Sequence, residues 1–320
     1  MKQADKKPLL VVGGPTASGK TRLAVDLAKA LGGEIVCADS MQVYREMEIG
    51  TAAPTPEEMQ GVPHHLFGIL SPKESFSVAR YVELATEVID EIHSRGKLPV
   101  LCGGTGLYIS ALTDNLCFDE AIAENPALRR ELRELAAAKG NEHLWAMLRD
   151  VDPPLAQKLH PNNLGRIIRA LEVYRASGRP MSEWQRRARQ GESPYRLCFL
   201  ALCYRDRKLL YRRIEMRVDQ MLQQGLLKEV KSLLDKGYQG TAMQAIGYKE
   251  LAGYLAGEQS LEEAVETLKR QTRRYAKRQM TWLRRDERIH WLEADAFDSY
   301  NTLLQAALDA VKGNGITLAE

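Results

Sequence analysis

The sequence predicts an α/β fold, in which helices flank a parallel sheet and an all-helical domain is inserted into it. Residues 9–12, 34–39 and 98–102 are short, near-continuous apolar runs, as is typical of parallel strands covered on both faces. A stretch of helical period, residues 78–94, separates the second run from the third. Residues 112–194 contain no convincing strand but several helical stretches, and this difference predicts the insertion.

The remaining elements follow from periodicity and from helix start and stop signals. Asn125-Pro126 is a start signal, and Gly140 and Gly178 are stop signals. Inside the insertion we therefore expect helices at residues 126–139, 142–151 and 163–177. Beyond it we expect strands at 196–204 and 289–292, and helices at 206–224, 226–236, 248–256 and 261–284. Residues 51–76 are rich in Pro and Gly and are expected to form loop with short helical turns. The prediction is a sheet domain of residues 1–111 and 195–320, with a helical insertion domain at 112–194.

A glycine-rich loop follows the first strand directly, and a segment of helical period follows the loop. The loop matches the Walker A pattern in the strand, loop and helix context that this pattern requires. Its residues are Gly14, Pro15, Thr16, Ala17, Ser18, Gly19, Lys20 and Thr21. Backbone N–H groups of such a loop surround a phosphate, and the helix N-terminus adds partial positive charge. Lys20 is placed to reach phosphate oxygens, and the Thr21 hydroxyl to reach Mg²⁺. The sequence therefore predicts a P-loop NTPase-like sheet that binds a di- or triphosphate, as ATP-binding proteins do.

Two polar residues stand at the ends of other predicted strands. Asp39 ends the second strand, and Thr105 lies in the glycine run that closes the third. Because the carboxyl ends of parallel strands meet at the ligand crevice, we expect both side chains beside the phosphate loop. Asp39 has three possible roles: a general base, an indirect magnesium ligand, or the N-cap of a following helix. Its position at a strand end favours a role in the site.

Composition excludes some classes of protein. The chain has 320 residues, 44% of them hydrophobic, and a formal net charge of +3. It has five cysteines with no C-x-x-C pair, and Cys37, Cys102 and Cys198 lie in apolar runs, as buried cysteines do. No apolar run approaches the length of a membrane span, and no signal peptide is recognisable. We therefore expect a cytoplasmic protein that does not contact a membrane.

Two stretches are strongly basic. Residues 166–196 contain eight arginines against three acids, and residues 267–288 contain nine Lys or Arg against two acids. Such a run is often a solvated helix face. Tyrosines and tryptophans interleave both runs, however, and clustered cations with aromatic planes suit the phosphates and bases of nucleic acid. Arginine also suits bidentate phosphate contacts. Both stretches are therefore predicted to bind nucleic acid.

Arg213 and Arg217 lie one turn apart on the flank of a predicted amphipathic helix. Either arginine could stabilise charge on a leaving phosphate. Either could instead pair along the helix with Glu215 or Asp219. The residues alone leave this choice open.

These motifs, taken together and in order, resemble the tRNA dimethylallyltransferases of bacterial type, also called tRNA isopentenyltransferases. The resemblance covers nearly the whole chain. It rests on residues 14–21, 39–45, 49–52, 63–66, 103–108, 160–163, 166–172, 247–250 and 277–284. No Cys or His cluster follows Arg288, so we expect no zinc finger of the kind that eukaryotic relatives carry.

The resemblance implies a reaction and its partners. Dimethylallyl pyrophosphate would give its dimethylallyl group to the exocyclic N6 amine of the adenosine 3′ of the anticodon, and pyrophosphate would leave. Lys20, Arg217 and a Mg²⁺ ion on Thr21 would neutralise the leaving group. Asp39 would take the proton of the amine, with Thr105 beside it. The tRNA anticodon stem-loop would be the partner of a monomeric enzyme.

The resemblance also implies a set of tRNA-binding residues, carried by the strand ends, the insertion and the last long helix. They are Asp39, Ser40, Met41, Gln42, Thr105, Arg129, Arg166, Arg169, Gly247, Tyr248, Lys249, Lys277, Arg278, Gln279, Trp282 and Arg284.

Three other functions share parts of this pattern. A small-molecule kinase has the same loop, but it leaves the second basic stretch unexplained. An ATPase that uses RNA as a platform would hydrolyse ATP without modifying the RNA. A non-catalytic RNA-binding module would have no use for Lys20, Thr21 and Asp39 at strand ends.

Overall fold

The core of the protein is a six-stranded sheet in which every neighbouring pair of strands is parallel. In the computed structural model, which describes residues 6–116, 124–188 and 192–316, the strand order is β3-β2-β4-β1-β5-β6. The strands are β1 (Lys7–Gly13), β2 (Gly33–Cys37), β3 (His64–His65), β4 (Leu98–Gly103), β5 (Tyr195–Cys203) and β6 (Ile289–Glu293). The predicted α/β fold is confirmed. Among the strands, only β3, which has two residues, was not expected.

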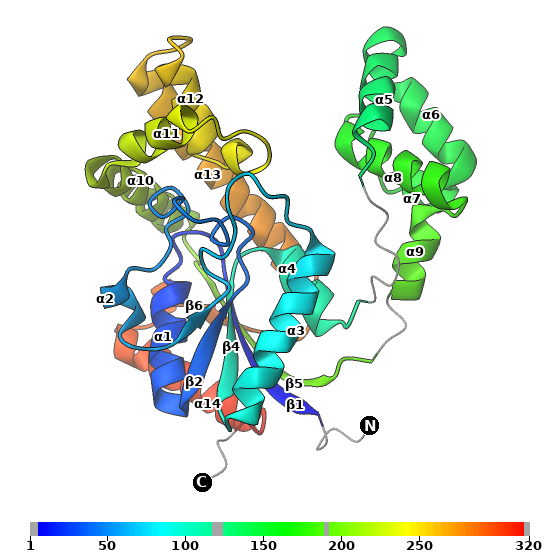
Figure 1. Ribbon diagram of the computed structural model, residues 1–320. Helices are drawn as coiled ribbons and strands as arrows, with labels where there is room; N and C mark the ends of the chain where they lie inside the picture. Colours follow the sequence, from blue (N-terminus) through cyan, green and yellow to red (C-terminus); the bar gives the residue numbers. More distant parts are fainter. Residues whose placement is uncertain (1–5, 117–123, 189–191, 317–320) are drawn as a thin grey trace. The chain divides into compact units, whose positions relative to one another are not determined.

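Helices cover both faces of this sheet (Figure 1). The first core lies between the sheet and helices α1 (Lys20–Leu31) and α14 (Tyr300–Gly313). The second core lies on the other face, under α3 (Val78–Ser94) and α4 (Gly106–Thr113). Helix α3 has the predicted bounds, whereas α4 and α14 were not predicted. The phosphate loop leaves β1, a strand that both layers cover.

A third apolar core lies around the loops at the carboxyl end of the sheet. It is built from the loop after β2 and from the helices α10 (Arg207–Gln224), α11 (Leu226–Asp235), α12 (Tyr248–Leu255) and α13 (Leu261–Leu283). The predicted loop at 51–76 contains the short helix α2 (Pro56–Met59), as expected, and also the unexpected strand β3. Each of these four longer helices has bounds within one residue of those predicted.

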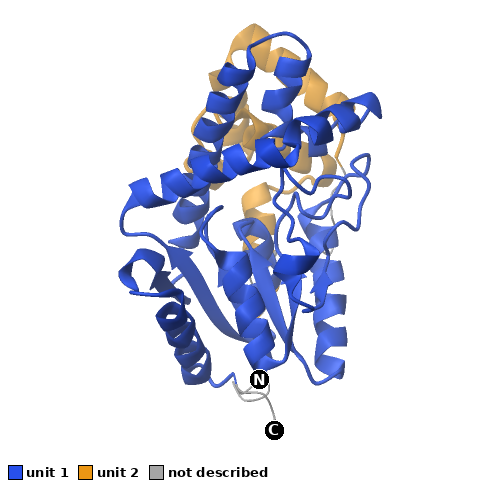
Figure 2. Cartoon of the chain, turned by 90° about the vertical axis from the view of Figure 1, so that its left-hand side faces the viewer, with its two compact units in different colours: residues 1–113, 194–320 blue, residues 114–193 orange. Residues whose placement is uncertain are grey.

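The chain divides into two compact units, coloured in Figure 2. Unit 1 comprises Met1–Thr113 and Pro194–Glu320, and unit 2, here called the helical unit, comprises Asp114–Ser193. The helical unit contains α5 (Pro126–Lys139), α6 (Asn141–Val151), α7 (Pro153–Ala156), α8 (Leu164–Ser177) and α9 (Met181–Ala188). It has an apolar core of its own. None of the helices among the described residues is long and apolar enough to cross a membrane.

Candidate active site

The phosphate loop joins β1 to α1 and is held from outside by two distant helices. Its backbone has positive φ at Ala17 (62°) and Gly19 (95°). The Ala17 carbonyl accepts a hydrogen bond from Arg213 Nε at 2.9 Å, and the Thr16 N–H donates to Gln279 Oε1 at 2.9 Å. Helices α10 and α13 therefore fix the conformation of the eight-residue pattern at positions 14–21.

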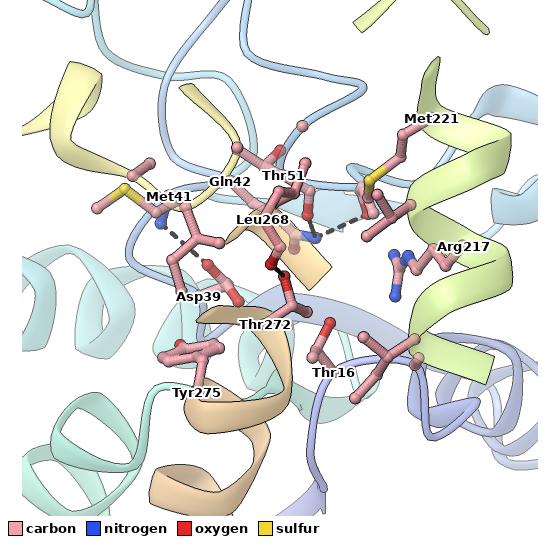
Figure 3. Close-up of a pocket in the computed structure, with 18 of the residues that line it drawn as sticks. Thr16, Asp39, Met41, Gln42, Thr51, Arg217, Met221, Leu268, Thr272 and Tyr275 are labelled. Atoms are coloured by element: carbon pink, nitrogen blue, oxygen red, sulfur yellow. Dashed lines mark hydrogen bonds between the residues drawn. The ribbon is translucent and has the colours of Figure 1, made fainter. Parts of the chain in front are cut away.

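Two cations face the pocket beside this loop. Lys20 Nζ lies 3.5 Å from the Pro15 carbonyl, and Arg217 reaches in from α10 (Figure 3). Among the described residues, neither group pairs with a carboxylate. The two acids that neighbour Arg217 on the helix pair elsewhere, Glu215 with Arg273 and Asp219 with Lys269. The choice that the sequence left open is thereby decided against an ion pair along the helix. Burial lowers the pKa of both cations, and Lys20 and Arg217 also lie close enough for their like charges to repel. A bound polyanion would relieve this repulsion.

The Thr21 hydroxyl also lines the pocket, and it has no hydrogen-bond partner within the described ranges. Those ranges hold no group of three or more His, Cys, Asp or Glu side chains that could bind a metal. A metal at this loop would therefore bind one hydroxyl, phosphate oxygens and water, which is the ligand set that Mg²⁺ accepts. The residues present fit such an ion.

Asp39 and Thr105 lie two residues beyond the ends of β2 and β4, and Asp39 lines the pocket beside the phosphate loop, whereas Thr105 is not among the residues that line it. The Thr105 N–H donates to the Ala38 carbonyl at 3.1 Å, and Thr105 Oγ1 accepts from the Ser40 N–H at 3.0 Å. Asp39 Oδ1 accepts from the Met41 N–H at 2.9 Å, and no helix begins there, so Asp39 is not a helix N-cap. The other carboxylate oxygen has no hydrogen-bond partner in the part of the chain that the structure describes.

A single pocket of about 400 Å³ contains both the phosphate loop and Asp39. Figure 3 shows Thr16, Arg217 and Met221 on one side of it, Asp39 and Tyr275 on another, and Leu268 between them. Six apolar side chains form part of its wall: Ile214, Val218, Met221, Leu226, Ile246 and Leu268. The arrangement can bind an anion at one end, an apolar group in the middle and a proton donor at the carboxylate.

The loop that carries the predicted residues Ser40, Met41 and Gln42 is anchored by a carboxylate that sequence reasoning missed. Glu229 on α11 accepts three backbone N–H groups of residues 48–50 at 2.8–3.0 Å, and the Tyr248 hydroxyl at 2.7 Å. Gln42 Nε2 in turn donates to the carbonyls of Thr51 and Ala52. No motif marks Glu229, because an isolated glutamate on a helix has no sequence signature.

The other predicted residues from this part of unit 1 differ in exposure. Gly247 and Lys249 line the pocket, and Lys249 is exposed. Tyr248 is fully buried and bonds to Glu229, so its contacts are internal. Its role in tRNA binding stays a prediction.

Helix α13 places its predicted tRNA-binding residues in different surroundings. Lys277, Arg278 and Arg284 are exposed, and none of the three pairs with a carboxylate of the described residues. Gln279 lies on the buried side of the helix. The Trp282 ring packs on the backbone of Gly106, where a Cβ would lie 2.3 Å from the ring. The three cations are free to meet phosphates, and tRNA contacts of Gln279 and Trp282 stay predictions.

Two of the predicted tRNA-binding arginines in the helical unit contact a buried carboxylate. The Glu172 side chain is 1% exposed and accepts hydrogen bonds from Arg129 Nε and Nη2, both at 2.9 Å, from Arg169 Nη1 and from the Asn125 N–H. Arg166, one turn from Arg169 on α8, is exposed and has no carboxylate partner in the described residues. The structure thus gives Arg129 and Arg169 an internal role, and their contact with tRNA stays a prediction.

Comparison with known proteins identifies relatives of this chain over nearly its whole length. The family model described as IPP transferase matches residues 42–286, and that described as isopentenyl transferase matches residues 8–74. A tRNA dimethylallyltransferase of Acetivibrio thermocellus is 50% identical over 299 residues, covering 93% of this chain and 95% of the relative. One of Geobacter metallireducens is 51% identical over 302 residues, covering 93% and 97%.

Two solved structures of enzymes that transfer such groups to tRNA have the same fold. The tRNA isopentenylpyrophosphate transferase of Bacillus halodurans is 45% identical, with a TM-score of 0.73 and 97% coverage of both chains. A eukaryotic dimethylallyltransferase acting on tRNA is 29% identical, with a TM-score of 0.80, covering 97% of this chain and 79% of the other. The chain therefore belongs to the IPP transferase family and is related over nearly its whole length to the tRNA dimethylallyltransferases.

Proposed function

We propose that this protein transfers the dimethylallyl group of dimethylallyl pyrophosphate to the N6 amine of the adenosine immediately 3′ of the anticodon in a subset of tRNAs. One observation carries the proposal beyond the family name. A single pocket joins a phosphate loop, and two cations that have no carboxylate partner in the described part of the chain, to a carboxylate across an apolar wall. A kinase needs the first of these features, but it has no need for the apolar wall between the loop and Asp39.

The phosphate loop and its cations bind the pyrophosphate end of the donor. When the bond between C1 of the dimethylallyl group and the pyrophosphate oxygen breaks, the oxygen keeps the electron pair and gains negative charge. Lys20 and Arg217 lie where that charge develops, and neither has a carboxylate partner among the described residues. Cations that are already in place stabilise the transition state more than the bound substrate.

The apolar wall holds the five-carbon group between the loop and Asp39. Leu268 lies between Asp39 and Arg217 in Figure 3, and Met221 lines the pocket from the helix of Arg217. A branched alkenyl group gains free energy by leaving water beside these side chains. The wall also keeps water away from an electron-poor carbon, which favours attack by the amine over hydrolysis.

Asp39 takes up the proton from the adenine amine. The lone pair of this amine is delocalised into the ring, so the amine becomes an adequate nucleophile only as its proton leaves. Asp39 has one carboxylate oxygen without a hydrogen bond in the described structure, and the Met41 N–H orients the other. The N6–C1 bond forms as the N6 proton moves to this free oxygen. An unpaired base in an anticodon loop reaches such a pocket at small cost.

Mg²⁺ is the expected metal, with Thr21 as its protein ligand. When bound, it adds positive charge to the leaving pyrophosphate. The exposed cations of α13 and Arg166 of the helical unit bind backbone phosphates of the anticodon stem-loop. We further propose that the protein acts as a monomer in the cytoplasm.

A single assay tests this proposal. The protein is incubated with dimethylallyl pyrophosphate labelled in the alkenyl group, Mg²⁺ and bulk tRNA, without ATP, and the tRNA is digested to nucleosides. We expect label on N6 of adenosine and none on pyrophosphate. A parallel reaction contains ATP, and label that enters tRNA only in that reaction, together with hydrolysis of the ATP, would refute the proposal.

A further inference from the structure

Gln279 on α13 bonds two loops at once. The Thr16 N–H donates to Gln279 Oε1 at 2.9 Å, and Gln279 Nε2 donates to the Gly104 carbonyl at 3.0 Å. A backbone N–H can only donate and a carbonyl can only accept, so both ends of the carboxamide have fixed roles. The residue is 5% exposed, and each of its side-chain polar atoms already has a partner.

This contact requires glycine at position 104. A Cβ on Gly104 would lie 2.1 Å from Gln279 Nε2, closer than two unbonded atoms can approach. The Gly104 carbonyl is therefore open to the carboxamide only because the residue has no side chain. The hydrogen bond between the loops thus needs a carboxamide at position 279 and a residue without a side chain at position 104.

Of the two loops that Gln279 joins, one belongs to the proposed leaving-group site and the other is connected to the proposed base, Asp39. Thr16 belongs to the phosphate loop, which binds the leaving group. Gly104 directly precedes Thr105, whose Oγ1 accepts from the N–H of Ser40, the neighbour of Asp39. The reacting carbon and nitrogen must approach to about 3–3.5 Å with the correct alignment. The distance between these loops therefore sets how the donor meets the nucleophile.

We propose that Gln279 is a positioning residue, which fixes the spacing between the phosphate loop and the two connected loops that carry Thr105 and Asp39. This inference rests on the proposed function. This role differs from the tRNA contact that the resemblance implied for Gln279, because both of its side-chain polar atoms bond to the two loops and it acts through them. It aligns the two substrates after each has bound, so its loss lowers kcat more than the affinity for either substrate.

The first test replaces Gln279 by Met, which has a similar length and lacks the carboxamide. We expect kcat for dimethylallyl transfer to fall about 10- to 100-fold, since small misplacements of reacting groups have effects of this size. The Kd values for tRNA and for pyrophosphate should each change by less than about threefold, well below the kcat effect. Gln271→Met is the matched control, because Gln271 lies on the same helix, is half-buried and has no hydrogen-bond partner in the described residues. Its kcat should equal that of the wild type.

A second variant, Gln279→Glu, gives a readout that packing alone would not change. When the introduced carboxyl group is ionised, it accepts from the Thr16 N–H but cannot donate to the Gly104 carbonyl. When the group is protonated, it can do both. The ratio of variant to wild-type kcat should therefore rise as the pH falls.

Three results would overturn the inference. They are a wild-type kcat in Gln279→Met, an equal loss in Gln271→Met, and a kcat ratio for Gln279→Glu that does not change with pH. If Gln279→Met fails to fold, the Gln279→Glu ratio decides alone. A wild-type protein that transfers no dimethylallyl group would instead refute the proposed function.

Discussion

The pocket of unit 1 and the core of the helical unit both place a carboxylate near two cations, yet they use these charges differently. In the helical unit, Glu172 accepts hydrogen bonds from Arg129 and Arg169 with both of its oxygens. In the pocket, Asp39 and the cations Lys20 and Arg217, all within the described residues, make no ion pair with one another. Glu172 therefore has its charged partners inside the protein, whereas we expect the charged groups of the pocket to find theirs in bound ligands.

This difference separates structural charges from functional ones. A buried carboxylate that has all its partners inside the protein stabilises one conformation, and removing a partner leaves a buried charge. Cations that face a pocket without partners repel one another until a ligand of opposite charge binds. Basic composition does not distinguish the two cases, since both regions are rich in arginine.

The largest expected effect is that of removing the base. Asp39→Asn should lower the rate of dimethylallyl transfer about 100- to 10,000-fold, the usual contribution of a positioned proton acceptor. tRNA affinity and thermal stability should remain near the wild-type values, because the amide keeps the bond from the Met41 N–H. Single-turnover kinetics with saturating tRNA measure the rate. Turnover close to the wild type would remove Asp39 from the mechanism.

The next effect concerns the unpaired cations of the pocket. Lys20→Ala should lower kcat/KM for dimethylallyl pyrophosphate about 100- to 1,000-fold, because the cation meets charge that grows in the transition state. Burial lowers the pKa of Lys20, so in the wild type pyrophosphate affinity should fall as the pH rises, at a lower pH than for an exposed lysine. Calorimetric titration with pyrophosphate at several pH values measures this. An identical pH dependence in Lys20→Ala would exclude Lys20 as its source.

In the helical unit we expect loss of stability instead of loss of chemistry. Arg129→Met should destabilise this unit by about 3–5 kcal/mol, because Glu172 would lose a bidentate partner while staying buried. Burial alone would raise the pKa of Glu172, but the hydrogen bonds from Arg129, Asn125 and Arg169 lower it below its usual 4.5. Its contribution to stability is therefore complete above that value and is lost as the pH falls through the lowered pKa.

Urea unfolding of the wild type and of Arg129→Met, between neutral pH and about pH 3, measures both effects. The variant should lose less stability than the wild type as the pH falls, because the pKa of Glu172 is then closer to its value in the unfolded chain. An unchanged free energy of unfolding at neutral pH would show that the Glu172 cluster is not structural.

The sequence predicted the elements with a strong local signal and missed those defined by tertiary contacts. The helix at Val78–Ser94 and the strand ends at Asp39 and Thr105 were predicted because period and glycine-rich turns are local patterns. The strand β3 has two residues, too few to show alternation. The contacts of Glu229 with residues 48–50 and of Glu172 with Arg129 join positions far apart in the chain, and no local pattern records them.

The most direct measurement compares two arginines one turn apart on α8. Arg166 is exposed without a carboxylate partner in the described residues, whereas Arg169 contacts Glu172. The affinity for tRNA is measured over a range of salt concentrations for Arg166→Met and Arg169→Met, at a temperature where both are folded. We expect Arg166→Met to reduce the slope of log K against log salt by about one, as one lost phosphate contact does. Arg169→Met should keep the wild-type slope. Equal reductions in both variants would contradict the division into free and internally paired cations.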